Sequence, residues 1–115
     1  MVSPHPENKK FVEAVRTKIG SDAIVTFNHA QASDGMTVLF KMLESQAGKP
    51  FDGAAAIAAV KGFSWIGPQG PIRIDPETRN SIMNIYIRHV ERIDGRLLNA
   101  VADTIPNVRD PGLSN

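Results

Sequence analysis

The first part of the chain places apolar residues at helical spacing between short polar segments. Pro6 followed by Glu7 is a typical helix start, and apolar side chains then recur every three or four residues until Gly20. This pattern predicts a helix from about 6 to 19. The next segment, Ala23–Phe27, is short, rich in β-branched residues and bounded by polar residues, which is typical of a buried strand in a parallel sheet.

Two more helices are predicted before residue 62. Ser33 or Asp34 can accept the first free backbone amides of a helix that runs to about 47. Its apolar stripe, at three- and four-residue steps, consists of Met36, Leu39, Phe40 and Leu43. Asp52 is a natural N-cap for a third helix over the alanine-rich segment 54–60.

Beyond residue 62 the periodicity changes from helical to alternating. Gly67–Pro71 predicts a reversal between two short extended segments, and Asp75 with the following proline predicts a capping turn. Apolar residues at every second position from 83 to 87 then predict a long strand with one apolar face. Asp94-Gly95 supplies the two left-handed positions of a tight hairpin, and residues 106–115 are expected to form a surface tail.

These elements predict an α/β fold, with helices packed on a short parallel sheet followed by a long C-terminal β-hairpin. The chain has 115 residues, of which 42% are hydrophobic and 22% charged, as expected for one globular domain. Its 13 basic and 12 acidic residues give a net charge of +1. Nucleic acid is therefore not an expected partner.

The sequence shows no arrangement typical of an enzyme. There is no cysteine, and the three histidines, His5, His29 and His89, are not spaced as metal ligands or catalytic pairs. Asp75 and Glu77 are expected to point to water from a capping turn, and Trp65 is expected to pack rather than to stack on a ligand. We therefore expect no catalytic residue, no metal and no cofactor.

Two further expectations concern membranes and export. The first residues do not have the basic and apolar segments of a signal peptide. No apolar run reaches the length of about 18 residues that a transmembrane helix needs. We expect neither a signal peptide in this chain nor insertion into a membrane.

Several segments resemble the ligand-binding receptors of ABC importers for branched-chain amino acids, the type I periplasmic binding proteins. Pro6–Val12 is similar to a late helix of that family, and Ala32–Met36 is similar to its Ala-Tyr-Asp-Ala or Ala-Tyr-Asp-Gly helix start, with Ser33 in place of the tyrosine. Lys61–Asp75 resembles the family's closing Gly-Pro hairpin before an acidic residue, and Ile85–Arg96 resembles its last strands. The chain thus looks like the C-terminal portion of such a receptor.

The resemblance implies a division of the chain and a candidate site. Residues 1–80 would contribute to the first lobe, residues 81–105 would form a strand pair that crosses the hinge, and residues 106–115 would be the tail. Family ligands lie between two lobes, at the carboxyl ends of strands. Phe27, Asn28 and His29 would then provide ligand contacts, or would only pack and cap.

Two functions of different classes follow. The first is non-catalytic capture of a branched-chain amino acid or a related carboxylate solute, with an ABC permease as partner and the periplasm as location. The second is a small α/β protein that self-associates and binds no ligand. In either case we expect a homo-oligomer, because the apolar face of the long hairpin needs to be covered. The sequence does not name the ligand.

Overall fold

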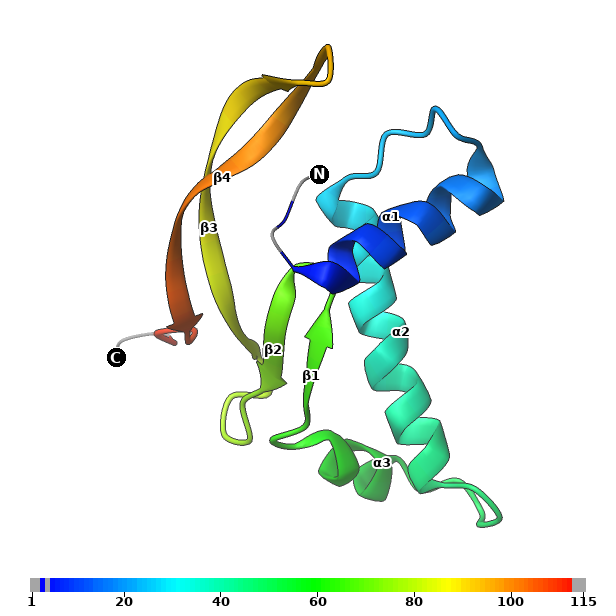
Figure 1. The fold of residues 1–115 in the computed structure, drawn as a ribbon. Coiled ribbons are helices and arrows are strands. Elements are labelled where there is room, and N and C mark those ends of the chain that lie inside the picture. The colour runs from blue at the N-terminus through cyan, green and yellow to red at the C-terminus, as the bar shows by residue number, and fades with distance from the viewer. Residues whose placement is uncertain (1–2, 4, 113–115) are drawn as a thin grey trace.

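The computed structural model describes residue 3 and residues 5–112, which form three helices and a four-stranded sheet (Figure 1). The helices are α1 (Pro6–Ile19), α2 (Phe27–Ser45) and α3 (Gly53–Val60). The strands are β1 (Ser64–Gly67), β2 (Gly70–Ile74), β3 (Ser81–Ile93) and β4 (Arg96–Val108), in the sheet order β1-β2-β3-β4. The predicted α/β class and the long C-terminal hairpin are confirmed.

The predicted parallel sheet and its strand at Ala23–Phe27 are wrong. All pairings among the described strands are antiparallel, and residues 23–26 are an extended linker that joins no ladder. Val25 is buried while Ile24 is 81% exposed, so the apolar run passes over the surface of the fold instead of through a sheet. A β-branched run forms a strand only where a neighbouring strand can pair with it, and the described residues offer none here.

Helix α2 begins about two turns earlier than predicted. Thr26 and His29 form a capping box, in which the Thr26 N–H donates to His29 Nδ1 at 3.2 Å. Ser33 and Asp34, the expected caps, therefore lie inside the helix. The predictions of α1 and α3 are confirmed, and Asp52 Oδ1 accepts the backbone N–H groups of Ala54 and Ala55.

The reversal between β1 and β2 is confirmed, and it holds the helices to the sheet. The Asn8 side chain, buried on α1, donates to the carbonyl of Pro68 at 3.0 Å. Tyr86 on β3 donates to the carbonyl of Gln69. A Cβ at Gly67 would overlap the Asp34 carboxylate of α2, so only glycine allows α2 to approach this closely.

Asp34 connects α2 to β1 through the single tryptophan. Trp65 Nε1 donates to Asp34 Oδ1 at 2.9 Å, and the Trp65 ring stacks on Phe63 with centroids 5.1 Å apart. The packing role expected for Trp65 is confirmed. Burial raises the pKa of Asp34, and the hydrogen bond from Trp65 partly opposes that rise.

The C-terminal residues are anchored further than predicted. Strand β4 continues through Val108, so the surface tail does not begin at residue 106. Arg109 then donates to the carboxylates of Asp75 and Glu77. The expectation that Asp75 points to water is wrong, because its side chain is only 2% exposed and is paired with this guanidinium.

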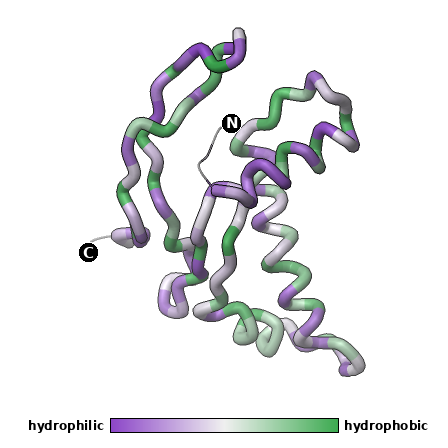
Figure 2. The backbone as a smooth tube through the Cα atoms, viewed as in Figure 1, coloured by the Kyte–Doolittle hydropathy of each residue, from purple (hydrophilic) through white to green (hydrophobic). Residues whose placement is uncertain are grey.

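The fold is open rather than compact. Its radius of gyration is 16.6 Å, compared with about 13 Å for a compact chain of this length. The buried apolar residues are few and mostly small: Val25, Ala30, Ala56, Val60, Ile72, Ile82 and Ala100. Apolar segments instead lie along the outside of α2 and the hairpin, as the colouring of Figure 2 shows.

The β3–β4 turn gives a first prediction. Asp94 and Gly95 have φ angles of 49° and 78°, the left-handed pair that a two-residue hairpin turn requires, and this confirms the predicted turn. Because a β-branched side chain is strongly disfavoured there, Gly95→Val should lower the free energy of unfolding by about 1–2 kcal/mol in chemical denaturation. Asp94→Asn is the control and should change it by less than about 0.5 kcal/mol. An unchanged midpoint for Gly95→Val would contradict the turn assignment.

The Asp75–Arg109 pair gives a prediction about acid stability. The pKa of Asp75 is lowered, mainly because its carboxylate accepts the Glu77 backbone N–H and also because Arg109 donates to it, although burial opposes this. Stability from this group is therefore fully present above the unfolded pKa of about 3.9, and is lost as the pH falls through the lower folded pKa.

We expect Asp75→Asn to be less stable than the parent at pH 7, and the difference to shrink as the pH falls below about 4. Denaturation midpoints measured from pH 7 to pH 2 test this. Glu77→Gln is the control, since Glu77 is exposed, and should have a smaller effect. The pKa of Asp34 is raised, so its contribution to stability depends on pH in the opposite direction. That contribution is the same in the parent and in both variants, and it drops out of the difference between them. A difference that stays constant across this range would refute the role of the ionised carboxylate.

Candidate functional site

A cavity of about 330 Å³ lies between the start of α2 and the distal half of the hairpin. Its walls are the linker and first turn of α2 on one side and strands β3 and β4 on the other. The lining residues are Ile24, Val25, Thr26, Phe27, Asn28, Arg88, Leu97, Leu98 and Asn99. This volume is at the lower end of the range of about 300–1,000 Å³ for small-molecule sites.

The capping box fixes the first wall of this cavity. Thr26 has extended backbone angles and ends the linker, so Phe27 and Asn28 lie in the first turn of α2. Phe27 is 57% exposed, which leaves its ring available to a ligand. His29 is used by the cap, where its Nδ1 also lies 3.0 Å from the Thr26 hydroxyl, and it is not among the lining residues.

The structure thus brings two of the three predicted site residues to a cavity, on a helix start instead of at the end of a strand. The sequence contains a signal for this. A threonine at the N-cap with a hydrogen-bonding side chain three residues later is a capping box, here with histidine at the position that glutamate or glutamine usually occupies.

The second wall comes from residues that sequence reasoning missed. Arg88 on β3 lies with its guanidinium carbon 5.5 Å from the centroid of the Tyr86 ring, and it lines the cavity together with Asn99 of β4. Strand pairing sets Asn99 opposite Val90, two residues beyond Arg88. The pattern of apolar and polar positions indicated a strand there, but not which segment of the chain the strand would face.

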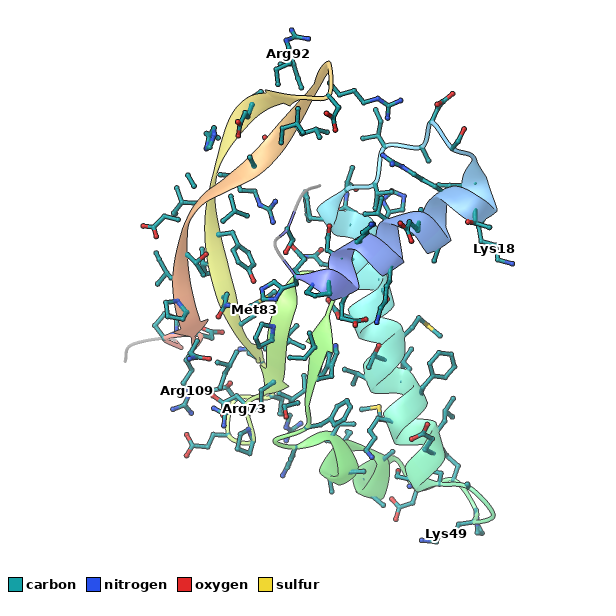
Figure 3. All side chains as sticks on the ribbon, viewed as in Figure 1. Lys18, Lys49, Arg73, Met83, Arg92 and Arg109 are labelled. Atoms are coloured by element: carbon teal, nitrogen blue, oxygen red, sulfur yellow. The ribbon has the colours of Figure 1, made fainter. Side chains whose placement is uncertain are left out.

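A larger opening continues from this cavity toward the hairpin tip. It has a volume of about 850 Å³ and shares Ile24, Val25, Leu97 and Leu98 with the smaller cavity. Arg96 at the tip approaches Asp22, the residue before the linker, at 3.7 Å, across two exposed side chains. Figure 3 shows Arg92 at this tip and Arg109 at the other end of the hairpin. The linker and the hairpin therefore form the two sides of one groove.

The smaller cavity is lined by groups that can bind a small molecule. It offers an aromatic face, two side-chain amides and a guanidinium, which together suit a small molecule with an apolar body and a carboxylate. Within residues 3 and 5–112 no three histidine, cysteine or acidic side chains gather as metal ligands. No helix in the described part of the chain is long and apolar enough to cross a membrane.

Comparison with known proteins identifies the relatives of this chain. The family model described as periplasmic binding protein matches residues 3–96. The Leu/Ile/Val-binding protein homolog 6 of Brucella abortus (strain 2308) is 47% identical over 109 residues, which are 94% of this chain and 28% of that protein. The chain therefore spans less than a third of the length of the curated relatives that it matches.

Solved structures agree in fold. A solute binding protein of an ABC transporter from Rhodopseudomonas palustris HaA2, in complex with p-hydroxybenzoic acid, is 41% identical with a TM-score of 0.84, over 96% of this chain and 30% of that one. The protein from R. palustris BisB5, in complex with 3,4-dihydroxybenzoic acid, is also 41% identical, with a TM-score of 0.87 and the same coverage. A substrate-binding protein from Sphaerobacter thermophilus is 27% identical with a TM-score of 0.81, over 91% of this chain and 28% of that one.

The expected resemblance is confirmed by a family match over most of the chain and by close relatives in both sequence and structure. The expectation that the chain is not an enzyme agrees with a family of binding proteins. The chain belongs to the periplasmic binding protein family.

Proposed function

We propose that this chain forms one wall of the solute cleft in the substrate-binding component of an ABC importer, and that the solute is a small organic carboxylate. The observation that carries the proposal is the shared cavity, where Phe27 and Asn28 of α2 meet Arg88 and Asn99 of the hairpin. The whole component would act in the periplasm, bind solute without covalent chemistry and present it to a membrane permease.

Two solute classes fit this chemistry. Relatives are described as Leu/Ile/Val-binding homologues or as complexes with hydroxybenzoic acids, and both kinds of solute carry a carboxylate on an apolar body. Arg88 would bind the carboxylate, and Phe27 would contact the apolar body. We favour an aromatic acid, because Phe27 can stack on a ring and the relatives in complex with such acids are about as similar to this chain as the Leu/Ile/Val-binding homologue.

The mechanism would be closure of the cleft around the solute. A ligand that contacts both walls binds the closed arrangement better than the open one and shifts the population toward it. The start of α2 is held by its cap and by the Asp34–Trp65 bond, and at the hairpin tip Arg96 approaches Asp22 across two exposed side chains. The wall at α2 is therefore the fixed one in this proposal, and the hairpin wall is the one that moves.

The test uses a chimera in which this chain replaces the matched 109 residues of the Brucella abortus relative. We expect calorimetry to show micromolar or tighter binding of 4-hydroxybenzoate, and Arg88→Met to weaken it at least about tenfold, as loss of a charge-assisted hydrogen bond predicts. Arg73→Met is the matched control, because it removes the same charge from a position outside the cavity, near the base of β2 (Figure 3).

The isolated chain should bind neither 4-hydroxybenzoate nor leucine at micromolar concentration, because half a site leaves polar groups of the solute unsatisfied. Tight 1:1 binding by the isolated chain would contradict a cleft shared with the rest of the relative. Equal loss of binding in the Arg88 and Arg73 variants would remove Arg88 from the site. Binding of leucine but not of 4-hydroxybenzoate would exclude the aromatic class.

A second candidate is a self-associating interaction protein, and the hairpin favours it. Ile85, Ile87 and Ile105 are each 44–50% exposed on long strands, and strand β4 forms an edge of the sheet. Two copies that cover this face would form a homodimer. We expect light scattering with size exclusion to give a dimer mass for the isolated chain. A monomer mass at every concentration, with the hairpin amides still protected from hydrogen exchange, would contradict it.

A further inference from the structure

Tyr86 and Arg88 lie two positions apart on β3, so their side chains share one face of the strand. Both are half-buried, whereas Ile85, Ile87 and His89 are exposed on the other face. The face of Tyr86 and Arg88 is therefore the inner face of the hairpin, and Arg88 lines the cavity at the start of α2. The guanidinium carbon of Arg88 lies 5.5 Å from the centroid of the Tyr86 ring, within the range of a cation–π contact.

The hydroxyl of Tyr86 fixes the far end of this ring. It donates to the carbonyl of Gln69, and its oxygen lies 3.2 Å from His5 Nε2 and 3.5 Å from Asn84 Nδ2. A hydroxyl has one proton and two lone pairs, so these three partners use its full hydrogen-bonding capacity, with both nitrogens as donors. A Cβ at Gly70 would come within 2.6 Å of the hydroxyl and of His5 Nε2, so only glycine leaves room for this arrangement.

An arginine that is held in place binds a carboxylate more tightly than one that moves freely. The arginine side chain has many rotamers, and ordering it on binding costs affinity. An aromatic ring that holds the guanidinium in advance removes part of this cost. The ring contacts the flat face of the guanidinium and not the N–H groups at its edge, so it does not compete with the carboxylate. An acidic side chain in the same place would hold the arginine but would compete.

We propose that Tyr86 is a positioning residue of the solute site. Its ring holds the Arg88 guanidinium at the cavity, and its hydroxyl connects the ring to the β1–β2 turn through Gln69. The inference rests on the proposed function, because it concerns how Arg88 binds the carboxylate of the solute. It extends the site from the cavity walls to the turn that holds the helices to the sheet.

A double-mutant cycle in the chimera described above tests the contact by calorimetry with 4-hydroxybenzoate. Tyr86→Leu should weaken binding about five- to tenfold, because the guanidinium loses the ring that orders it. In the Arg88→Met background, Tyr86→Leu should change the affinity by less than about twofold. Equal weakening by Tyr86→Leu in both backgrounds, with a full effect of Arg88→Met, would overturn this inference alone. No effect of Arg88→Met would refute the proposed function and this inference with it.

Tyr86→Phe is the matched control, because it keeps the ring and removes only the hydroxyl. It should bind 4-hydroxybenzoate within about threefold of the parent, although it lowers the denaturation midpoint because the Gln69 carbonyl loses its donor. If Tyr86→Phe weakened binding as much as Tyr86→Leu does, Tyr86 would act through the stability of the fold, and the inference would be wrong.

A readout without solute uses the isolated chain. A group over the face of an aromatic ring is shielded by the ring current, so the NMR signal of the Arg88 Nε–H should lie upfield of its position in Tyr86→Leu. The upfield position should persist in Tyr86→Phe. Identical positions of this signal in the parent and in Tyr86→Leu would overturn the inference, whether or not the chimera binds 4-hydroxybenzoate.

Discussion

The contacts around the Gly67–Gly70 turn hold the separate parts of this fold together. Asn8 of α1 and Tyr86 of β3 bind its two central carbonyl groups, and the Asp34 carboxylate of α2 occupies the space beside Gly67. At Gly70, with a φ of 113°, a side chain would collide with Tyr86 and His5. The chain has few buried apolar residues, so these polar contacts at one short turn hold the helices to the sheet, a role that a large apolar core has in most domains.

The elements that the sequence predicts well are those determined by local chemistry. The proline at the start of α1, the Asp52 cap of α3 and the Asp94-Gly95 turn each fix the backbone within a few residues. The wrong predictions concern long-range partners. The run at 23–27 has the composition of a strand, but no strand pairs with it in the described residues. Asp75 is in a capping turn that the sequence predicts to be exposed, but Arg109, 34 residues later, donates to its carboxylate.

The candidate site shows the same division. The family resemblance predicts Phe27, Asn28 and His29 as ligand contacts. Phe27 and Asn28 line a cavity, whereas the role of His29 as a cap follows from its spacing to Thr26 alone. Arg88 and Asn99 could not be assigned from periodicity. Alternation along a strand tells which residues share a face, but the tertiary fold decides what that face meets.

The length of the hairpin has a mechanical consequence. Each of its two strands has 13 residues, so at about 3.3 Å per residue the tip lies about 40 Å from the base. The base is held by Arg109 to the turn that follows β2, while at the tip the exposed side chain of Arg96 approaches Asp22. A rotation of the hairpin by about 10° about its base would therefore move the tip by about 7 Å, which is comparable to the width of a benzene ring.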